Sequence, residues 1–72
     1  MKKIKKIKIR LNGKNKTIKE NEKLSDLIKS IKIPIKKVAI ELNQKIVEKK
    51  KLNRIFLKSD DKIEIVHFIG GG

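Results

Sequence analysis

The sequence contains no cysteine. This absence excludes a disulfide framework and a metal site built on thiolates, so a small fold must hold together by packing alone. Without a cysteine thiol, a chain that carries sulfur would have to hold it on another group. Tryptophan and tyrosine are absent too, and Phe56 and Phe68 are the only aromatic residues. Two phenylalanines offer no stacking platform for unpaired bases, which argues against a protein built to read single-stranded RNA.

Long hydrophobic runs are also missing. No apolar stretch approaches the roughly 20 residues that span a bilayer, and the opening MKKIKKIKIRLNGK alternates where a signal peptide needs a continuous apolar core. We therefore expect a cytoplasmic protein without a membrane partner. Its 72 residues form one domain, in which only about 60% of the unfolded surface is buried on folding. Catalytic pockets rarely fit in so small a domain, so we do not expect an enzyme.

Acidic residues are scarce. The chain has 8 Asp and Glu against 21 Lys and Arg, a formal net charge of +13. Lysine outnumbers arginine 19 to 2, whereas phosphate-reading proteins use the planar fork of arginine heavily. The joint excess of Lys, Ile and Asn is typical of an AT-rich genome, so codon bias is one source of the charge and function is the alternative. We expect nonspecific, salt-dependent attraction to nucleic acid through the lysines at 2, 3, 5, 6, 8 and 49–51, and Arg10.

The first elements are predicted by apolar periodicity. Ile7, Ile9 and Leu11 alternate with basic residues as in a strand, and Asn12-Gly13 is a strong signal for a tight hairpin turn. We expect a hairpin over about residues 3–20.

The next segment changes to a helical period. Apolar residues at 24, 27, 28 and 31 form one stripe on a helix. Asn21 is the expected cap, and Pro34 ends the helix after about Lys32. The predicted helix has about two and a half turns.

The second half of the chain returns to strands. VAIEL predicts a strand, NQ a turn and KIVEK a short partner strand. A loop with one helical turn follows, from which Leu52, Ile55 and Leu57 fill the core. The last strand, DDKIEIVHFI, points Ile63 and Ile65 inward.

The element order is therefore β-β-α-β-β-β. We expect an α+β domain in which one helix packs across a mixed sheet of about five strands. The last strand lies beside the first, parallel to it, in the middle of the sheet. Alternation places Val66 on the face opposite to Ile63 and Ile65, where a polar residue is expected. Its apolar side chain has two explanations. Either the strand is covered on both faces, or Val66 and Phe68 form an exposed docking patch for a partner.

Gly70, Gly71 and Gly72 follow this strand, and we expect a flexible tail over residues 69–72. Glycine lacks a Cβ and accepts any φ, so such a tail fits a narrow cleft of an enzyme. Attack by the Gly72 carboxylate on the α-phosphate of ATP would give an acyl-adenylate that a sulfur nucleophile can displace. The alternative is an inert frayed end.

Three motifs together carry a family resemblance. VAIELNQKIV, the acidic SDDKIEIV and the closing Gly-Gly resemble the ThiS family, the ubiquitin-like β-grasp sulfur carriers of thiamine biosynthesis, over residues 7–72. The resemblance implies a ubiquitin-like β-grasp fold. It also implies that a ThiF-like enzyme uses ATP to adenylate Gly72, with Gly71 beside it in the active site, and that the product becomes a thiocarboxylate. A ThiG-like thiazole synthase would then take the sulfur. We expect a monomer that binds no cofactor itself.

Several alternatives stay open. Related carriers serve molybdopterin synthesis or tRNA thiolation, and small basic β-grasp domains of the TGS type associate with RNA. His67 is the only histidine, and we interpret it as solvated or at an edge, neither a base nor a metal ligand. We interpret Asp60 and Asp61 as turn formers, not as a catalytic carboxylate pair.

Overall fold

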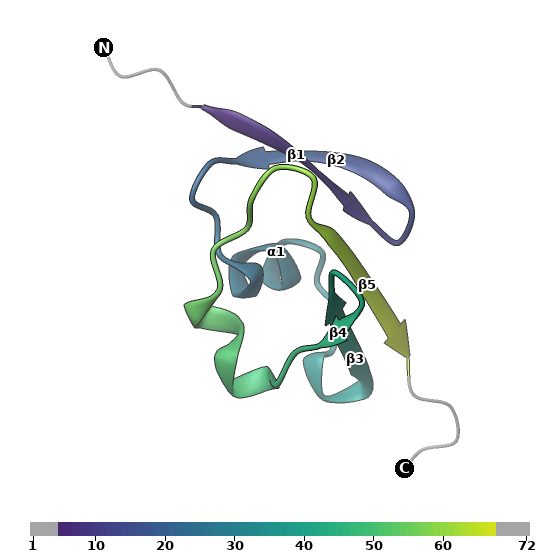
Figure 1. The fold of residues 1–72 in the computed structure, drawn as a ribbon. Helices are drawn as coiled ribbons and strands as arrows, with labels where there is room; N and C mark the ends of the chain where they lie inside the picture. Colours follow the sequence, from purple (N-terminus) through teal and green to yellow (C-terminus); the bar gives the residue numbers. More distant parts are fainter. Residues whose placement is uncertain (1–4, 68–72) are drawn as a thin grey trace.

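The computed structural model describes residues 5–67. Within this range the chain forms one mixed sheet of five strands in the order β2-β1-β5-β3-β4, with helix α1 packed against one face (Figure 1). The element order and the mixed sheet confirm the prediction. None of the helices in residues 5–67 is long and apolar enough to cross a membrane.

The N-terminal hairpin forms as predicted. Strand β1 (Lys6–Leu11) pairs antiparallel with β2 (Lys14–Lys19). Asn12 and Gly13 connect them with φ angles of 49° and 80°. Both angles lie in the left-handed region that a tight two-residue turn requires, and Asn and Gly adopt it at the lowest steric cost.

Helix α1 (Leu24–Ser30) differs from the prediction at its start. Asn21 is not the cap, because it has a φ of 68° and a capping residue needs an extended backbone. Lys23 occupies the cap position, and the Asp26 carboxylate accepts its backbone N–H at 3.2 Å. The helix is also shorter than predicted. It ends at Ser30 because Lys32, with a φ of 55°, turns the chain away before Pro34.

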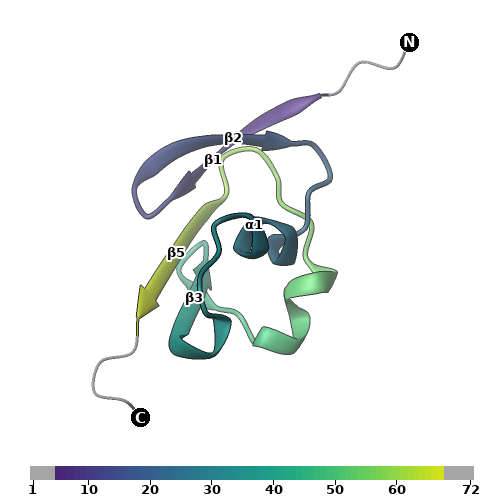
Figure 2. The same cartoon turned by 180° about the vertical axis from the view of Figure 1, so that it is seen from behind.

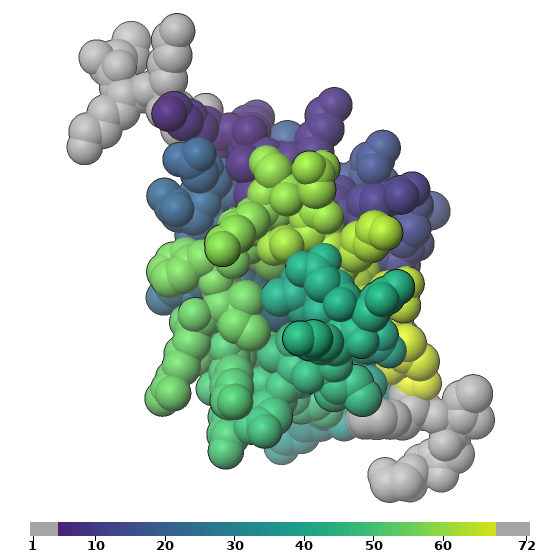
Figure 3. All heavy atoms as spheres, in the orientation of Figure 1, coloured from purple at the N-terminus to yellow at the C-terminus, as the bar shows by residue number. Residues whose placement is uncertain are grey.

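Two short strands and two 3₁₀ helices follow. A 3₁₀ turn that the sequence analysis did not predict, η1 (Ile35–Lys37), leads into β3 (Val38–Leu42), which pairs with β4 (Lys45–Ile46). The predicted helical turn in the following loop is η2 (Lys49–Arg54). Figure 3 shows how η2 and the β3–β4 hairpin form much of one side of the molecule.

Strand β5 (Lys62–His67) lies in the middle of the sheet, as predicted. It runs parallel to β1, with Arg10 beside Lys62 and Leu11 beside Ile63. On its other side it runs antiparallel to β3 over five residue pairs, from Leu42–Ile63 to Val38–His67. The last strand therefore lies between β1 from the first half of the chain and β3 from the second.

The hydrophobic core fills the space between the sheet and α1. Its ten buried side chains come from four strands, α1, η2 and the loop after η2, and none comes from η1 or β4: Ile9, Ile18, Leu24, Leu27, Ile28, Val38, Ile40, Leu52, Leu57 and Ile63. Burial of one such side chain stabilises the fold by about 1.5–3 kcal/mol. The loop residues Leu52 and Leu57 are buried and Ile55 is partly buried, which confirms that this loop completes the core. Within residues 5–67, no polar or charged residue is buried.

Candidate functional site at the end of the last strand

The described part of the predicted site is the strand that leads to the glycines. Gly71, Gly72 and Phe68 lie outside the described residues. Val66 is the second-last residue of β5. The structure therefore bears on how β5 is held, and on what surrounds Val66.

The inner face of β5 anchors the strand to the core. Ile63 is 1% exposed, and Ile65 packs against the buried cluster as a partly buried residue. The prediction that these two side chains point inward is confirmed. Because β5 is central and hydrogen-bonded on both sides, its base cannot move without disturbing the core.

The start of β5 is held by Asn43 and Asp61. The Asn43 side chain accepts the Lys62 N–H at 2.9 Å and donates to Asp61 Oδ1 at 3.0 Å. The other Asp61 oxygen accepts the Lys58 N–H at 2.8 Å. Asp60 has a φ of 70° and donates its N–H to the Lys8 carbonyl at 2.8 Å. The interpretation of the two aspartates as turn formers is confirmed, whereas the partner Asn43 was missed.

The middle of β5 is held by Asn12, which sequence reasoning identified only as a turn residue. Its backbone N–H donates to the Ile63 carbonyl at 2.9 Å. Its side-chain Oδ1 accepts the Ile65 N–H at 2.7 Å, across 53 positions in the sequence. The hairpin turn therefore braces the strand as well as reversing the chain. The NG signal predicts the turn but contains nothing about this distant partner.

Val66 lies on the outer face of the sheet, away from the helix. It is 52% exposed and stands opposite Ala39 on β3. The explanation that β5 is covered on both faces is therefore wrong at Val66, because no second layer covers this end of the outer face in the described structure. Glu64, two residues earlier, stands directly opposite Glu41. The surroundings of Val66 are thus apolar on one side and acidic on the other.

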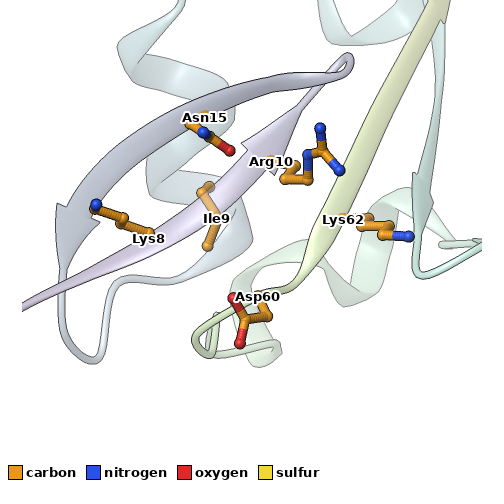
Figure 4. A pocket seen from close by; sticks show the side chains of 6 residues that line it. All are labelled: Lys8, Ile9, Arg10, Asn15, Asp60 and Lys62. Atoms are coloured by element: carbon orange, nitrogen blue, oxygen red, sulfur yellow. The ribbon is translucent and has the colours of Figure 1, made fainter.

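A hollow of about 460 Å³ lies on the outer face near the start of β5, at the opposite end of the strand from Val66. Figure 4 shows its lining: Lys8 and Arg10 from β1, Asn15 from β2, Asp60 from the preceding loop and Lys62 from β5. It contains no Ser, Cys or His that could act as a nucleophile or base. Its charged lining is mainly cationic, with Asp60 as the one carboxylate.

His67 is exposed on the last residue of β5, opposite Val38. This position confirms the interpretation of an edge or solvated histidine. Among residues 5–67 no three His, Cys, Asp or Glu side chains cluster so that they could hold a metal ion.

The sheet order, with a central parallel last strand and one helix across the sheet, defines a ubiquitin-like β-grasp domain, and the site is the strand that precedes its C-terminal residues. The structure is similar to the crystal structure of the thiamine biosynthesis protein ThiS from Geobacter metallireducens. The TM-score is 0.81 at 28% sequence identity, over 92% of this chain and 100% of that one.

Residues 9–72 match the model of the ThiS family. The chain is 40% identical to the sulfur carrier protein ThiS of Bacillus subtilis over 65 residues, which cover 89% of this chain and 98% of that protein. The chain belongs to the ThiS family.

A second kind of relative is much longer. The chain is 38% identical to a thiazole synthase of Magnetococcus marinus over 66 residues, or 92% of this chain. This match spans only 20% of the thiazole synthase. About a fifth of that protein is therefore similar to most of this chain.

Proposed function

We propose that this chain is a sulfur carrier of thiamine biosynthesis, and that the carboxylate of Gly72 carries the sulfur. The observation that supports this most directly is the bracing of β5. Asn43 and Asp61 hold its start, Asn12 holds Ile65, and Ile63 is buried in the core. The strand ends at His67, and Phe68, Ile69 and three glycines follow it in the sequence. A rigid base before side-chain-free residues suits the delivery of a carboxylate to another protein.

The carboxylate is converted in two steps, adenylation and displacement of AMP by sulfur. An oxygen of the Gly72 carboxylate attacks the α-phosphate of ATP, which forms an acyl-adenylate and releases pyrophosphate. Hydrosulfide from the sulfur donor then attacks the acyl carbon and displaces AMP, so that the carbon–oxygen bond to the phosphate breaks as the carbon–sulfur bond of the thiocarboxylate forms, and the proton of the hydrosulfide is lost to solvent. Gly71 enters the active site together with Gly72, and the chain itself supplies no catalytic group. The partner enzyme supplies the fixed donors that stabilise the developing charge.

The partners follow from the same chemistry. A ThiF-like enzyme would adenylate the tail with ATP, and a ThiG-like thiazole synthase would accept the sulfur. The thiazole synthase of Magnetococcus marinus supports the second partner, because a fifth of that protein is similar to this chain. It also favours thiamine biosynthesis over molybdopterin synthesis or tRNA thiolation. Phe68 and the exposed Val66 would contact the adenylating enzyme. A cytoplasmic location and a monomeric state remain predictions.

Mass spectrometry of the intact chain tests the proposal. Incubation with a ThiF-like enzyme, ATP and a sulfur donor should raise the mass by the difference between one sulfur and one oxygen. Deletion of Gly72, or one residue added after it, should abolish the change, because the carboxylate is removed or displaced. One residue added before Met1 is the matched control and should leave it intact. A mass change that survives deletion of Gly72 would refute the proposed role.

RNA binding is the second candidate, and one feature favours it. Like charges stand side by side on the outer face of the sheet, with Lys6 opposite Lys19 and Arg10 beside Lys62. A phosphate backbone would relieve their repulsion. If RNA binding were the function, affinity would persist at physiological salt and would not depend on Gly72. We expect binding that weakens steeply as salt rises, with no preference for one sequence.

A further inference from the structure

The two sides of β5 differ in how completely they are hydrogen-bonded. On the β3 side, the backbone groups of Glu64 and Val66 face Glu41 and Ala39 along a regular antiparallel pairing. On the β1 side, pairing is limited to two positions, Arg10 with Lys62 and Leu11 with Ile63. Strand β1 ends at Leu11, so it accompanies only the first part of β5.

Asn12 extends this pairing by one step. Its backbone donates to the Ile63 carbonyl, and its side chain accepts the Ile65 N–H. Backbone groups of alternate residues point to the same side of a strand. The Ile65 carbonyl and the His67 N–H therefore point to the β1 side as well, beyond the reach of the hairpin. In the described range, 5–67, neither group has a hydrogen-bond partner.

Both ribbon views (Figure 1, Figure 2) show that the hairpin does not reach the second half of β5. In Figure 1 the hairpin of β1 and β2 lies beside the upper part of β5 only, and Figure 2 shows the same from behind. No other described segment runs along that side of the strand's second half. An unpaired strand edge is a template on which another strand can add.

The side chains beside this edge indicate which strand would fit. Val66 is 52% exposed on the outer face and offers an apolar contact. Glu64 and Glu41 are directly opposite each other, an arrangement of like charges that costs stability. Neither carboxylate belongs to an ion pair in the described structure. A hollow of about 210 Å³ lies beside the part of β5 that precedes the open edge and is lined by Arg10, Gly13, Lys62, Ile63 and Glu64.

We propose that the free edge of β5 at Ile65 and His67 accepts an extended strand of the adenylating enzyme. The added strand bonds to the Ile65 carbonyl and the His67 N–H, places an apolar side chain on Val66 and a cationic one near Glu64, whose charge is crowded by Glu41 on the β3 side. This inference rests on the proposed function, since the partner is the enzyme that takes the tail. It assigns a backbone contact to the end of β5, where only the side chains of Val66 and Phe68 were predicted to dock a partner.

Amide hydrogen exchange on the full chain tests the contact directly. The His67 amide should exchange rapidly in the free chain and become protected in the complex with a ThiF-like enzyme, without ATP. The Val66 amide faces β3, so it is the internal control and should be protected in both states. An unprotected His67 amide in a saturated complex would overturn the proposal. Protection that appears in the chain alone as its concentration rises would assign the edge to a second copy, which also overturns it.

Two variants at one position test the energetic contribution. His67→Pro removes the N–H that faces the open edge, whereas His67→Ala removes only the side chain. Proline is tolerated where the missing N–H is not used inside the sheet. We expect the dissociation constant for the enzyme to rise about tenfold in His67→Pro, the effect of one lost hydrogen bond in a dry interface, and about twofold or less in His67→Ala. Equal affinities of the two variants would contradict strand addition.

Chemical synthesis provides a further variant in case proline disturbs the fold. N-methylation of the His67 backbone removes the same donor without fixing φ, and circular dichroism reports whether the sheet is retained. The outcomes also separate the two proposals. If the unmodified chain is not adenylated, the proposed function fails. If it is adenylated while His67 stays unprotected and tolerates N-methylation, only the strand contact fails.

Discussion

Replacement of Asn12 tests whether a turn side chain holds the strand that leads to the glycines. Asn12→Gly keeps the left-handed backbone of the turn, since glycine adopts the φ of 49° freely. It removes the Oδ1 acceptor that lies 2.7 Å from the Ile65 N–H. A hydrogen bond contributes about 0.5–1.5 kcal/mol net. A loss of about 1 kcal/mol raises the equilibrium constant for local opening at Ile65 about fivefold.

Amide exchange at Ile65 is the appropriate assay, because global stability mixes two effects. Glycine loses the hydrogen bond but relieves the left-handed strain of a residue with a Cβ, so the free energy of unfolding changes little. Asn12→Ala loses the bond and adds strain, so we expect about 2 kcal/mol of destabilisation in urea. Circular dichroism must follow the unfolding, because the chain has no tryptophan or tyrosine.

Asn12→Asp is the matched control. It keeps an acceptor oxygen in the same place and tolerates the same backbone conformation, so Ile65 should exchange nearly as in the unmodified chain. The reasoning would be refuted if Ile65 exchanged at the same rate in Asn12→Gly as in the unmodified chain.

Three further replacements test the scaffold and the docking surface. Asn43→Gly loses two hydrogen bonds but relieves left-handed strain at a φ of 52°, so it should lower the free energy of unfolding in urea by only about 1 kcal/mol. Asn43→Asp should lower it more, because the strain stays and the new carboxylate faces Asp61; the reverse order would contradict the assigned contacts. Ile63→Ala removes a side chain that is 1% exposed and should cost about 2–5 kcal/mol in thermal or urea unfolding, whereas a cost below about 1 kcal/mol would show that β5 does not anchor in the core. Val66→Asp should leave the free energy of unfolding within about 0.5 kcal/mol but weaken binding to a ThiF-like enzyme in calorimetry, and unchanged affinity would exclude Val66 from the interface.

Much of the fold is predictable because its signals are local. The alternation of Ile7, Ile9 and Leu11 and the Asn12-Gly13 turn determine a hairpin through short-range sterics and the need to bury one face. The apolar stripe of Leu24, Leu27 and Ile28 does the same for α1. These elements formed within a few residues of the expected bounds.

The wrong predictions concern positions where tertiary structure overrides a local sequence signal. Asn21 has a good capping side chain, but the chain turns sharply there with a φ of 68°, so Lys23 takes the cap position. Val66 had two explanations, a strand covered on both faces or an exposed patch, and the first is wrong because Val66 is exposed on the outer face. An isolated apolar residue does not reveal which layer, if any, lies over it.

The amino-acid sequence by itself determined the elements, their order and the glycines after the last strand, because backbone sterics and hydrophobic periodicity act over a few neighbouring residues. Only the tertiary structure decided what braces that strand. Asn12 meets Ile65, and Asn43 meets Asp61, because the sheet brings distant segments together. Hydrogen bonds across such separations depend on register and strand order, which no local pattern contains. The edge of β5 stays open beyond Asn12 for the same reason: β1 is too short to cover it.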